Sequence, residues 1–302
     1  MGKVVPLRTA TKQPVLLSVV DAVATFLARD WTDNTRRNFT SDLKRFNQAF
    51  GDRPVGDLNA VDLQSYLNGL TTRRGGVERP VSPQTYNRHF GTVSNVFAWL
   101  ERNDEVERNP MLKVERRKLG ERLPRPMTKG QLRAFFGRID DLRDKALFSL
   151  LHGSGLRICE ALGLDIEEVD LEAREFLVVG KGNRERVGYL AADTVKLLRR
   201  YLRERGRPRQ GPLFESRHGT RLSYARAYGL FRTYSDGLEK DGISLTIHQL
   251  RHSFGSERAG EMDALLLRDL MGHRSLRTTL QYAQVNGESA KKAFKIFDRN
   301  HE

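Results

Sequence analysis

The sequence predicts a mostly α-helical protein of two domains, with a small antiparallel β-sheet in the second domain. Three observations support this fold class. At 302 residues the chain is about twice the usual length of a single domain. Apolar residues recur at spacings of three and four in its first third, as in amphipathic helices. Two short β-rich runs in the second half are separated by Gly-Lys-Gly-Asn, which is a hairpin signal.

The first domain is expected at residues 15–107, as a small helical bundle without strands. Its helices are expected at residues 18–30, 32–50, 60–70 and 82–102. Ser82 and Pro83 begin the last helix as N-cap and first helical residue. The second helix carries four basic residues on neighbouring turns, which form either a phosphate-facing surface or an ordinary solvated face: Arg36, Arg37, Lys44 and Arg45.

Residues 108–125 are expected to form a basic linker between the domains. The segment holds two prolines, one glycine and seven basic side chains against two acidic ones. Such a segment is either a solvated tether or a strap that follows the backbone of a nucleic-acid duplex.

The second domain is expected at residues 126–302. Thr128 and Gln131 form a capping-box pattern that opens a helix to residue 138. A helix at 142–152 follows, and then the two strands at 175–179 and 184–190. The remaining helices are expected at 193–205, 224–239, 248–260, 263–271, 278–285 and 289–298.

Composition narrows the function classes. The 52 basic residues against 38 acidic ones give a net charge of +14, which favours a nucleic-acid partner. Cys159 is the only cysteine, so an internal disulfide and a multi-cysteine zinc site are excluded. Apolar runs are too short for a membrane span or a secretory signal, and we expect a soluble cytoplasmic protein. The motifs of nucleotide loops, zinc proteases and serine hydrolases are missing, which disfavours ATP-driven or metal-dependent hydrolysis.

Three segments concentrate residues that carry chemistry. Gly-Ser-Gly-Leu-Arg-Ile-Cys-Glu-Ala-Leu places Arg157 among small and apolar residues. In Thr-Ile-His-Gln-Leu-Arg-His-Ser-Phe, one helix face collects His248, Arg251 and His252 at positions i, i+3 and i+4. In the third segment, Leu-Met-Gly-His-Arg-Ser-Leu-Arg-Thr-Thr-Leu-Gln-Tyr-Ala, His273 precedes Tyr282 by nine residues.

In this order, with the Lys181 hairpin between the first two, these segments resemble the tyrosine recombinase (phage integrase) family. Gly-Leu-Arg-x-x-Glu-Ala-Leu is similar to the family's first box, His-x-Leu-Arg-His-Ser-Phe to its second, and the third segment to its nucleophile region. The resemblance extends over the whole chain. It implies a helical core-binding (SAM-like) domain, a linker and a tyrosine-recombinase catalytic domain, in the simple two-domain Xer plan without an additional arm-binding domain before Ser18.

The resemblance implies a role for each candidate residue. Tyr282 is the nucleophile and Lys181 the general acid, while phosphate contacts come from Arg157, Arg251, His248 and His273. The chemistry is consistent, because forked guanidinium donors suit the non-bridging phosphate oxygens and replace a metal ion. Lysine is a better proton donor to the leaving oxygen than arginine, whose pKa exceeds about 12. No metal, cofactor or small molecule is therefore expected.

Neighbouring residues receive weaker assignments. Glu160 either orients a basic group or makes a simple salt bridge, and His252 is expected to be structural. Arg184 and Arg186 suit contacts with the DNA backbone. The stretch from Gly255 to Arg258 departs from the Ala-Thr-x-Leu that is commoner in Xer proteins, which weakens an assignment to chromosome-dimer resolution.

The implied activity is site-specific recombination through a 3′-phosphotyrosyl intermediate, by a homo- or hetero-tetramer on two sites in double-stranded DNA. One alternative is a type IB topoisomerase-like relaxing enzyme, which would not form a Holliday junction between two sites. The other is a catalytically silent DNA-binding regulator, against which the full set of Arg, Lys, His, Arg, His and Tyr argues.

Overall fold

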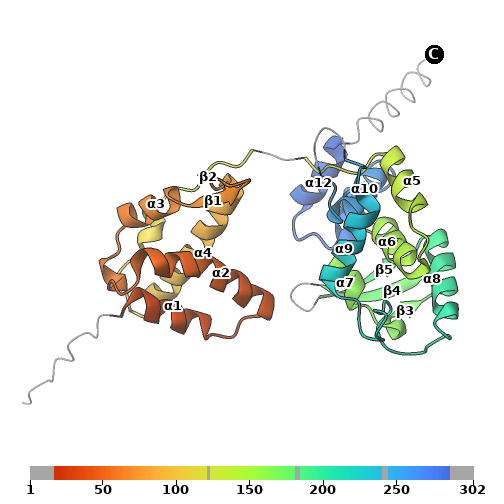
Figure 1. The fold of residues 1–302 in the computed structure, drawn as a ribbon, viewed down its shortest axis with the longest axis horizontal. Helices are drawn as coiled ribbons and strands as arrows, with labels where there is room; N and C mark the ends of the chain where they lie inside the picture. The colour runs from red at the N-terminus through yellow and green to blue at the C-terminus, as the bar shows by residue number, and fades with distance from the viewer. Residues whose placement is uncertain (1–16, 121–122, 181–183, 240–243, 286–302) are drawn as a thin grey trace, which may run out of the picture. The chain divides into compact units, whose positions relative to one another are not determined.

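The computed structural model describes residues 17–120, 123–180, 184–239 and 244–285. The chain divides into two compact units, Met1–Glu121 and Arg122–Glu302, and each is considered by itself. Figure 1 shows the helices and small sheets of both units. Lys181 and the helix predicted at 289–298 lie outside the described residues. Among the helices that the structure describes, none is long and apolar enough to span a bilayer.

Four helices build the first unit: α1 (Val19–Leu27), α2 (Asp33–Phe50), α3 (Ala60–Asn68) and α4 (Pro83–Arg102). Each begins at a side chain that caps its free N–H groups: Ser18, Thr32, Asn59 and Ser82. The expectation of an all-helical unit is wrong in one place. Strands β1 (Thr71–Arg74) and β2 (Val77–Pro80) form an antiparallel hairpin, whose turn is made by Gly75 and Gly76 at φ +59° and +80°. The polar strands carry no apolar alternation, so the glycine pair was the only signal.

The first part of the predicted linker packs on this unit. A 3-10 helix, Pro110–Lys113, and the residue after it bury Met111 and Val114 in the helical core. Beyond them, the side-chain amide of Asn87 exchanges two hydrogen bonds with the backbone of Arg117, at 2.8 and 3.0 Å. The Arg117 guanidinium lies 4.3 Å from the centre of the Tyr86 ring. This stretch is therefore ordered on the bundle, unlike a solvated tether.

A buried acidic side chain ties α2 to α4. Asp42 is 2% exposed and accepts a 3.0 Å hydrogen bond from the Thr92 hydroxyl. Arg88 approaches its other oxygen at 2.9 Å and His89 at 3.6 Å. Burial lowers the pKa of His89 although the Asp42 charge opposes this. Three α4 side chains on two adjoining turns thus stabilise the carboxylate, which fixes the contact between the two helices.

The second unit is helical around one small sheet. Its helices are α5 (Lys129–Gly137), α6 (Leu142–Ser154), α7 (Ile158–Gly163), α8 (Ala192–Glu204), α9 (Tyr224–Ser235), α10 (His248–Arg258), α11 (Ala264–Met271) and α12 (Leu276–Val285). Strands β3 (Val169–Asp170), β4 (Glu175–Gly180) and β5 (Arg184–Tyr189) pair antiparallel in the order β3-β4-β5. The sequence did not predict α7 or β3, which are short. The predicted helix 224–239 ends earlier, at Ser235, ahead of Gly237 at φ +68°.

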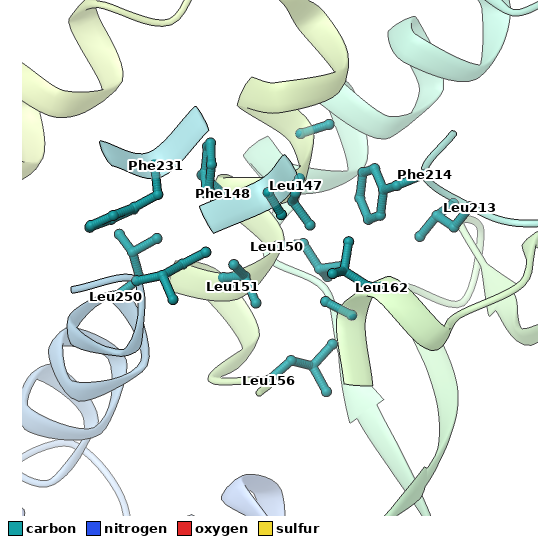
Figure 2. Packing of buried hydrophobic residues seen from close by; sticks show 14 of the residues in the cluster. Leu147, Phe148, Leu150, Leu151, Leu156, Leu162, Leu213, Phe214, Phe231 and Leu250 are labelled. Carbon is teal, nitrogen blue, oxygen red and sulfur yellow. The ribbon is translucent and has the colours of Figure 1, made fainter. Parts of the chain in front are cut away.

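Helix α6 lies at the centre of the second core. Leu147, Phe148, Leu150 and Leu151 of this helix pack between side chains of other elements, among them Leu162 of α7, Phe231 of α9 and Leu250 of α10 (Figure 2). The turn from α6 to α7 is held close to α10, because a Cβ on Gly155 would lie 2.4 Å from the Phe254 ring. The packing thus brings together α7 and α10, which carry two of the three predicted site segments.

We predict that Thr92→Val destabilises the first unit by about 1–3 kcal/mol, because it removes a donor from the buried Asp42 carboxylate. Both tryptophans, Trp31 and Trp99, lie in this unit, so urea unfolding followed by tryptophan fluorescence measures its free energy of unfolding. Thr40→Val is the matched control, since Thr40 is an exposed α2 residue that bonds only a helix carbonyl. It should change stability by less than about 0.5 kcal/mol. Equal losses from the two variants would contradict the prediction.

Candidate active site

Arg157 is held at the N-terminus of α7 by contacts on both sides of its guanidinium. Its Nη1 donates to Glu160 Oε1 at 2.8 Å, and its Nη2 donates to the carbonyl of Gly272 at 3.1 Å. Its backbone N–H donates to the other Glu160 oxygen at 2.9 Å. The side chain is nevertheless 41% exposed. The guanidinium is therefore oriented by the protein and still open to an anion.

Glu160 takes both of the roles proposed for it, because it makes salt bridges and orients basic groups. Besides Arg157, it binds Arg186 of β5, whose Nη2 lies 2.8 Å from Glu160 Oε2. Hydrogen bonds from the two arginines hold the pKa of Glu160 below its ordinary value although burial opposes this. Arg186 was expected at the DNA backbone, yet its side chain is only 14% exposed and points to Glu160.

Helix α10 presents the second group of predicted residues. Arg251 is 2% exposed, and its guanidinium donates to the carbonyl oxygens of Gly155 and Met271. Burial, together with the charge of Arg157, lowers the pKa of Arg251 to about 10. His248 and His252 stand edge-to-face on the same helix, with ring centroids 4.7 Å apart. Three α10 side chains thus face one region, as their spacing predicted.

Tyr282 of α12 is buried against this helix. Its hydroxyl lies 2.9 Å from Nδ1 of His252, and the ring is 2% exposed. Burial raises the pKa of Tyr282, while the charges of Arg251 and Arg157 lower it. His252, which the sequence suggested was structural, is therefore the hydrogen-bond partner of the predicted nucleophile. The signal for it was present, since His252 shares a helix face with His248 and follows Arg251 directly.

His273 completes the group from the turn between α11 and α12. Its ring stacks on the Tyr282 ring at 6.0 Å with an interplanar angle of 6°, and its Nδ1 lies 2.9 Å from the Thr279 hydroxyl. Burial, reinforced by Arg251 and Arg157, lowers the pKa of His273 to about 4. Burial and the neighbouring His248 and Arg251 lower the pKa of His252 to about 4 as well. Burial, together with the charges of Arg251 and Arg157, also lowers the pKa of His248.

The sixth predicted site residue, Lys181, lies outside the described part of the chain. The structure brings the other five together: Arg157, His248, Arg251, His273 and Tyr282. The Glu160 carboxylate binds two guanidinium groups, those of Arg157 and Arg186, and its charge also acts on the buried Arg251. The excess of positive charge suits an anionic group with several oxygens. Within the described residues no cluster of His, Cys, Asp and Glu could hold a metal ion.

The histidine pKa values predict that the second unit loses stability in acid. The ordinary histidine pKa is about 6.5, so the unfolded chain binds protons below pH 6.5 that native His252 and His273 take up only near pH 4. The contribution of these two histidines to the free energy of unfolding is therefore complete above pH 6.5, and it is lost as the pH falls from 6.5 to 4. From pH 7 to pH 5 the loss should be about 1–2 kcal/mol for each histidine.

Urea unfolding followed by far-UV circular dichroism at pH 7 and pH 5 measures this loss. The His252→Asn variant should lose less stability than the parent protein over this interval, by about 1–2 kcal/mol. His218→Asn, at an exposed histidine, serves as the control and should behave as the parent does. The same pH dependence in all three proteins would contradict the assignment.

Comparisons with known proteins agree with this geometry. The family model described as "Phage integrase family" matches residues 125–289. Tyrosine recombinase XerD of Mycobacterium leprae is 31% identical over 314 residues, covering 95% of this chain and 97% of the relative. Tyrosine recombinase XerD of Pseudomonas aeruginosa is 27% identical over 286 residues, with coverage of 91% and 93%.

Among solved structures, the fold is similar to that of the XerH site-specific recombinase in its post-cleavage complex with palindromic difH substrate. The TM-score is 0.68 at 22% sequence identity, covering 88% of this chain and 80% of XerH. The expected architecture, mostly α with a small antiparallel sheet in the second domain, is confirmed by this likeness.

Proposed function

Because the chain belongs to the phage integrase family of tyrosine recombinases, we propose that it recombines DNA at specific sites through a 3′-phosphotyrosyl intermediate. One observation carries the proposal: the Tyr282 hydroxyl lies 2.9 Å from a neutral histidine, within the field of Arg251 and Arg157. A tyrosine in such a setting is a nucleophile for a phosphodiester, since the cations favour both the phenolate and the charge that develops on phosphorus oxygens.

The reaction is a transesterification without net hydrolysis. The Tyr282 oxygen forms a bond to phosphorus while the bond from phosphorus to the 5′ oxygen breaks. The neutral ring of His252 accepts the phenol proton, and the leaving 5′ oxygen takes a proton from Lys181. Arg157 and Arg251 bind the non-bridging oxygens, with His248 and His273 as further donors. The phosphodiester energy stays in the phosphotyrosyl bond, so that a second strand end reverses the step without ATP.

Three features support double-stranded DNA as the partner. The net charge of +14 favours a polyanion, and the similar XerH structure holds its difH substrate. In the first unit, basic residues lie exposed on α2 and α4, among them Arg37, Lys44 and Arg88.

We propose that residues 15–107 bind the core site and residues 126–302 catalyse, in a tetramer that spans two sites in the cytoplasm. Holliday junctions between two sites distinguish this activity from topoisomerase-like relaxation.

We predict that Tyr282→Phe abolishes the covalent DNA adduct and leaves DNA binding intact. Phenylalanine keeps the ring that stacks on His273 and loses only the attacking oxygen. Incubation with a nicked suicide substrate, followed by denaturing electrophoresis, measures the adduct. Tyr189→Phe is the control, since Tyr189 is 54% exposed on β5, and it should give a normal yield. An adduct formed by the Tyr282→Phe protein would refute the assignment.

We predict that Lys181→Ala is rescued by a better leaving group. Replacing the bridging 5′ oxygen with sulfur removes most of the need for protonation. Cleavage of this substrate by Lys181→Ala should approach the parent rate, whereas Arg157→Ala should stay slow by about 100-fold, as for loss of one preorganised donor. If both variants were rescued equally, or neither, Lys181 would not be the acid.

A further inference from the structure

The β1–β2 hairpin of the first unit lies outside its core. It connects α3 to α4 (Figure 1), and the residues from 72 to 80 whose burial the structure describes are all exposed. Arg45 of α2 holds its base by donating to the carbonyl of Thr71 at 2.8 Å. A ribbon of two strands is marginal alone and presents two unpaired edges. A partner that covers the ribbon would therefore account for it, whereas packing within the unit does not.

The two faces of the hairpin differ in charge. Thr72 lies opposite Arg79 in the strand register, so these side chains share one face with Val77. We call this the Arg79 face. On the other face Glu78 lies opposite Arg73. Within the part of the chain that the structure describes, the Arg79 guanidinium has no hydrogen-bond or ion-pair partner. The Arg79 face is therefore the one that suits an anionic partner.

A basic pocket of about 290 Å³ adjoins the Arg79 face, between β1, α2 and α4. Thr72 belongs to both the pocket and the face. The cations of the pocket are Arg45 and Arg88, and serine and threonine hydroxyls line much of the rest. Asp42 balances one of the two cations, and His89 is neutral near pH 7 because burial lowers its pKa. One positive charge remains, which matches the single negative charge and the acceptor oxygens of a phosphodiester.

We propose that the β1–β2 hairpin recognises DNA sequence: the pocket binds a backbone phosphate while the Arg79 face contacts base edges in the major groove. The inference rests on the proposed function, because it requires a DNA duplex as the partner. The major groove of B-form DNA admits a two-stranded β-ribbon. A guanidinium there donates to the two acceptors of guanine, and an apolar side chain such as Val77 contacts a thymine methyl group. The carboxylate of Glu78 on the opposite face would be repelled by the phosphates.

The test uses the full chain and a pool of duplexes of randomised sequence. Repeated selection of bound duplexes gives a preferred duplex, and a scrambled duplex of the same composition measures non-specific binding. Fluorescence anisotropy gives the two affinities, whose ratio is the specificity. Arg79→Ala should lower affinity for the preferred duplex by about 10- to 100-fold, as for loss of one base contact, and affinity for the scrambled duplex much less. Selection with this variant should show relaxed preference at the base pair that Arg79 contacts.

Two further variants separate the ribbon from its charge and from the pocket. Arg73→Ala is the matched control, because it removes the same charge from the same ribbon on the opposite face, and it should leave the specificity unchanged. Arg88→Met removes a cation of the pocket. It should weaken binding of both duplexes alike and reduce the slope of log affinity against log salt concentration by about 1. Circular dichroism confirms that the compared proteins are folded.

Every other outcome counts against the inference. Equal loss of specificity in Arg79→Ala and Arg73→Ala would overturn it, because charge alone would then explain the effect. Unchanged specificity in Arg79→Ala, with a clear preference in the parent, would overturn it and leave the proposed function standing. An unchanged salt slope in Arg88→Met would remove the phosphate from the pocket. Self-association that Arg79→Ala abolishes without any effect on DNA binding would assign the ribbon to a second copy. A parent protein without any sequence preference would overturn the function and the inference together.

Discussion

A single carboxylate that binds two guanidinium groups is the interaction on which the second unit depends. Glu160 binds Arg157 and Arg186, which come from separate elements, while the buried Arg251 guanidinium donates to two backbone carbonyls. Burying a cation without an acid is costly, and the lowered pKa of Arg251 reflects that cost. The phosphodiester substrate proposed above would offset that cost.

Burial shifts the pKa of the other site residues upward where the charged form is an anion and downward where it is a cation. It raises the pKa of Tyr282 and lowers those of His252 and His273, so near neutral pH the tyrosine is a phenol and both histidines are neutral. The positive charge of the site then comes from arginines, which do not titrate there. Because Tyr282 is 2% exposed, the proposed attack on phosphorus requires α12 to shift first. The hydrogen bond to His252 and the stacking on His273 hold the tyrosine in its buried position.

The sequence predicted most of what depends on local patterns. Capping residues and apolar stripes located the helices, and the spacing of His248 and Arg251 placed them on one face. It failed where distant contacts decide. The direction of Arg186 follows from Glu160, which lies 26 positions earlier in the chain, and a basic residue on a polar strand gives no sign of that partner. The role of His252 depends in the same way on Tyr282, 30 positions away. The sequence did not predict that Met111 and Val114 are buried in the first core, because prolines and charged residues dominate their segment.

Two glycines, one in the first site segment and one directly after the second, show how close packing and chemistry are connected. A Cβ on Gly155 would lie 2.4 Å from the Phe254 ring, and one on Gly255 would lie 2.8 Å from the Tyr282 ring. Real side-chain carbons do not approach so closely, so each glycine permits an aromatic ring to lie directly on the backbone. Gly255 stands where Xer proteins more commonly have alanine, and here its missing methyl group is what lets Tyr282 settle against α10. The depth at which the proposed nucleophile is buried therefore depends on a residue to which the proposed reaction assigns no role.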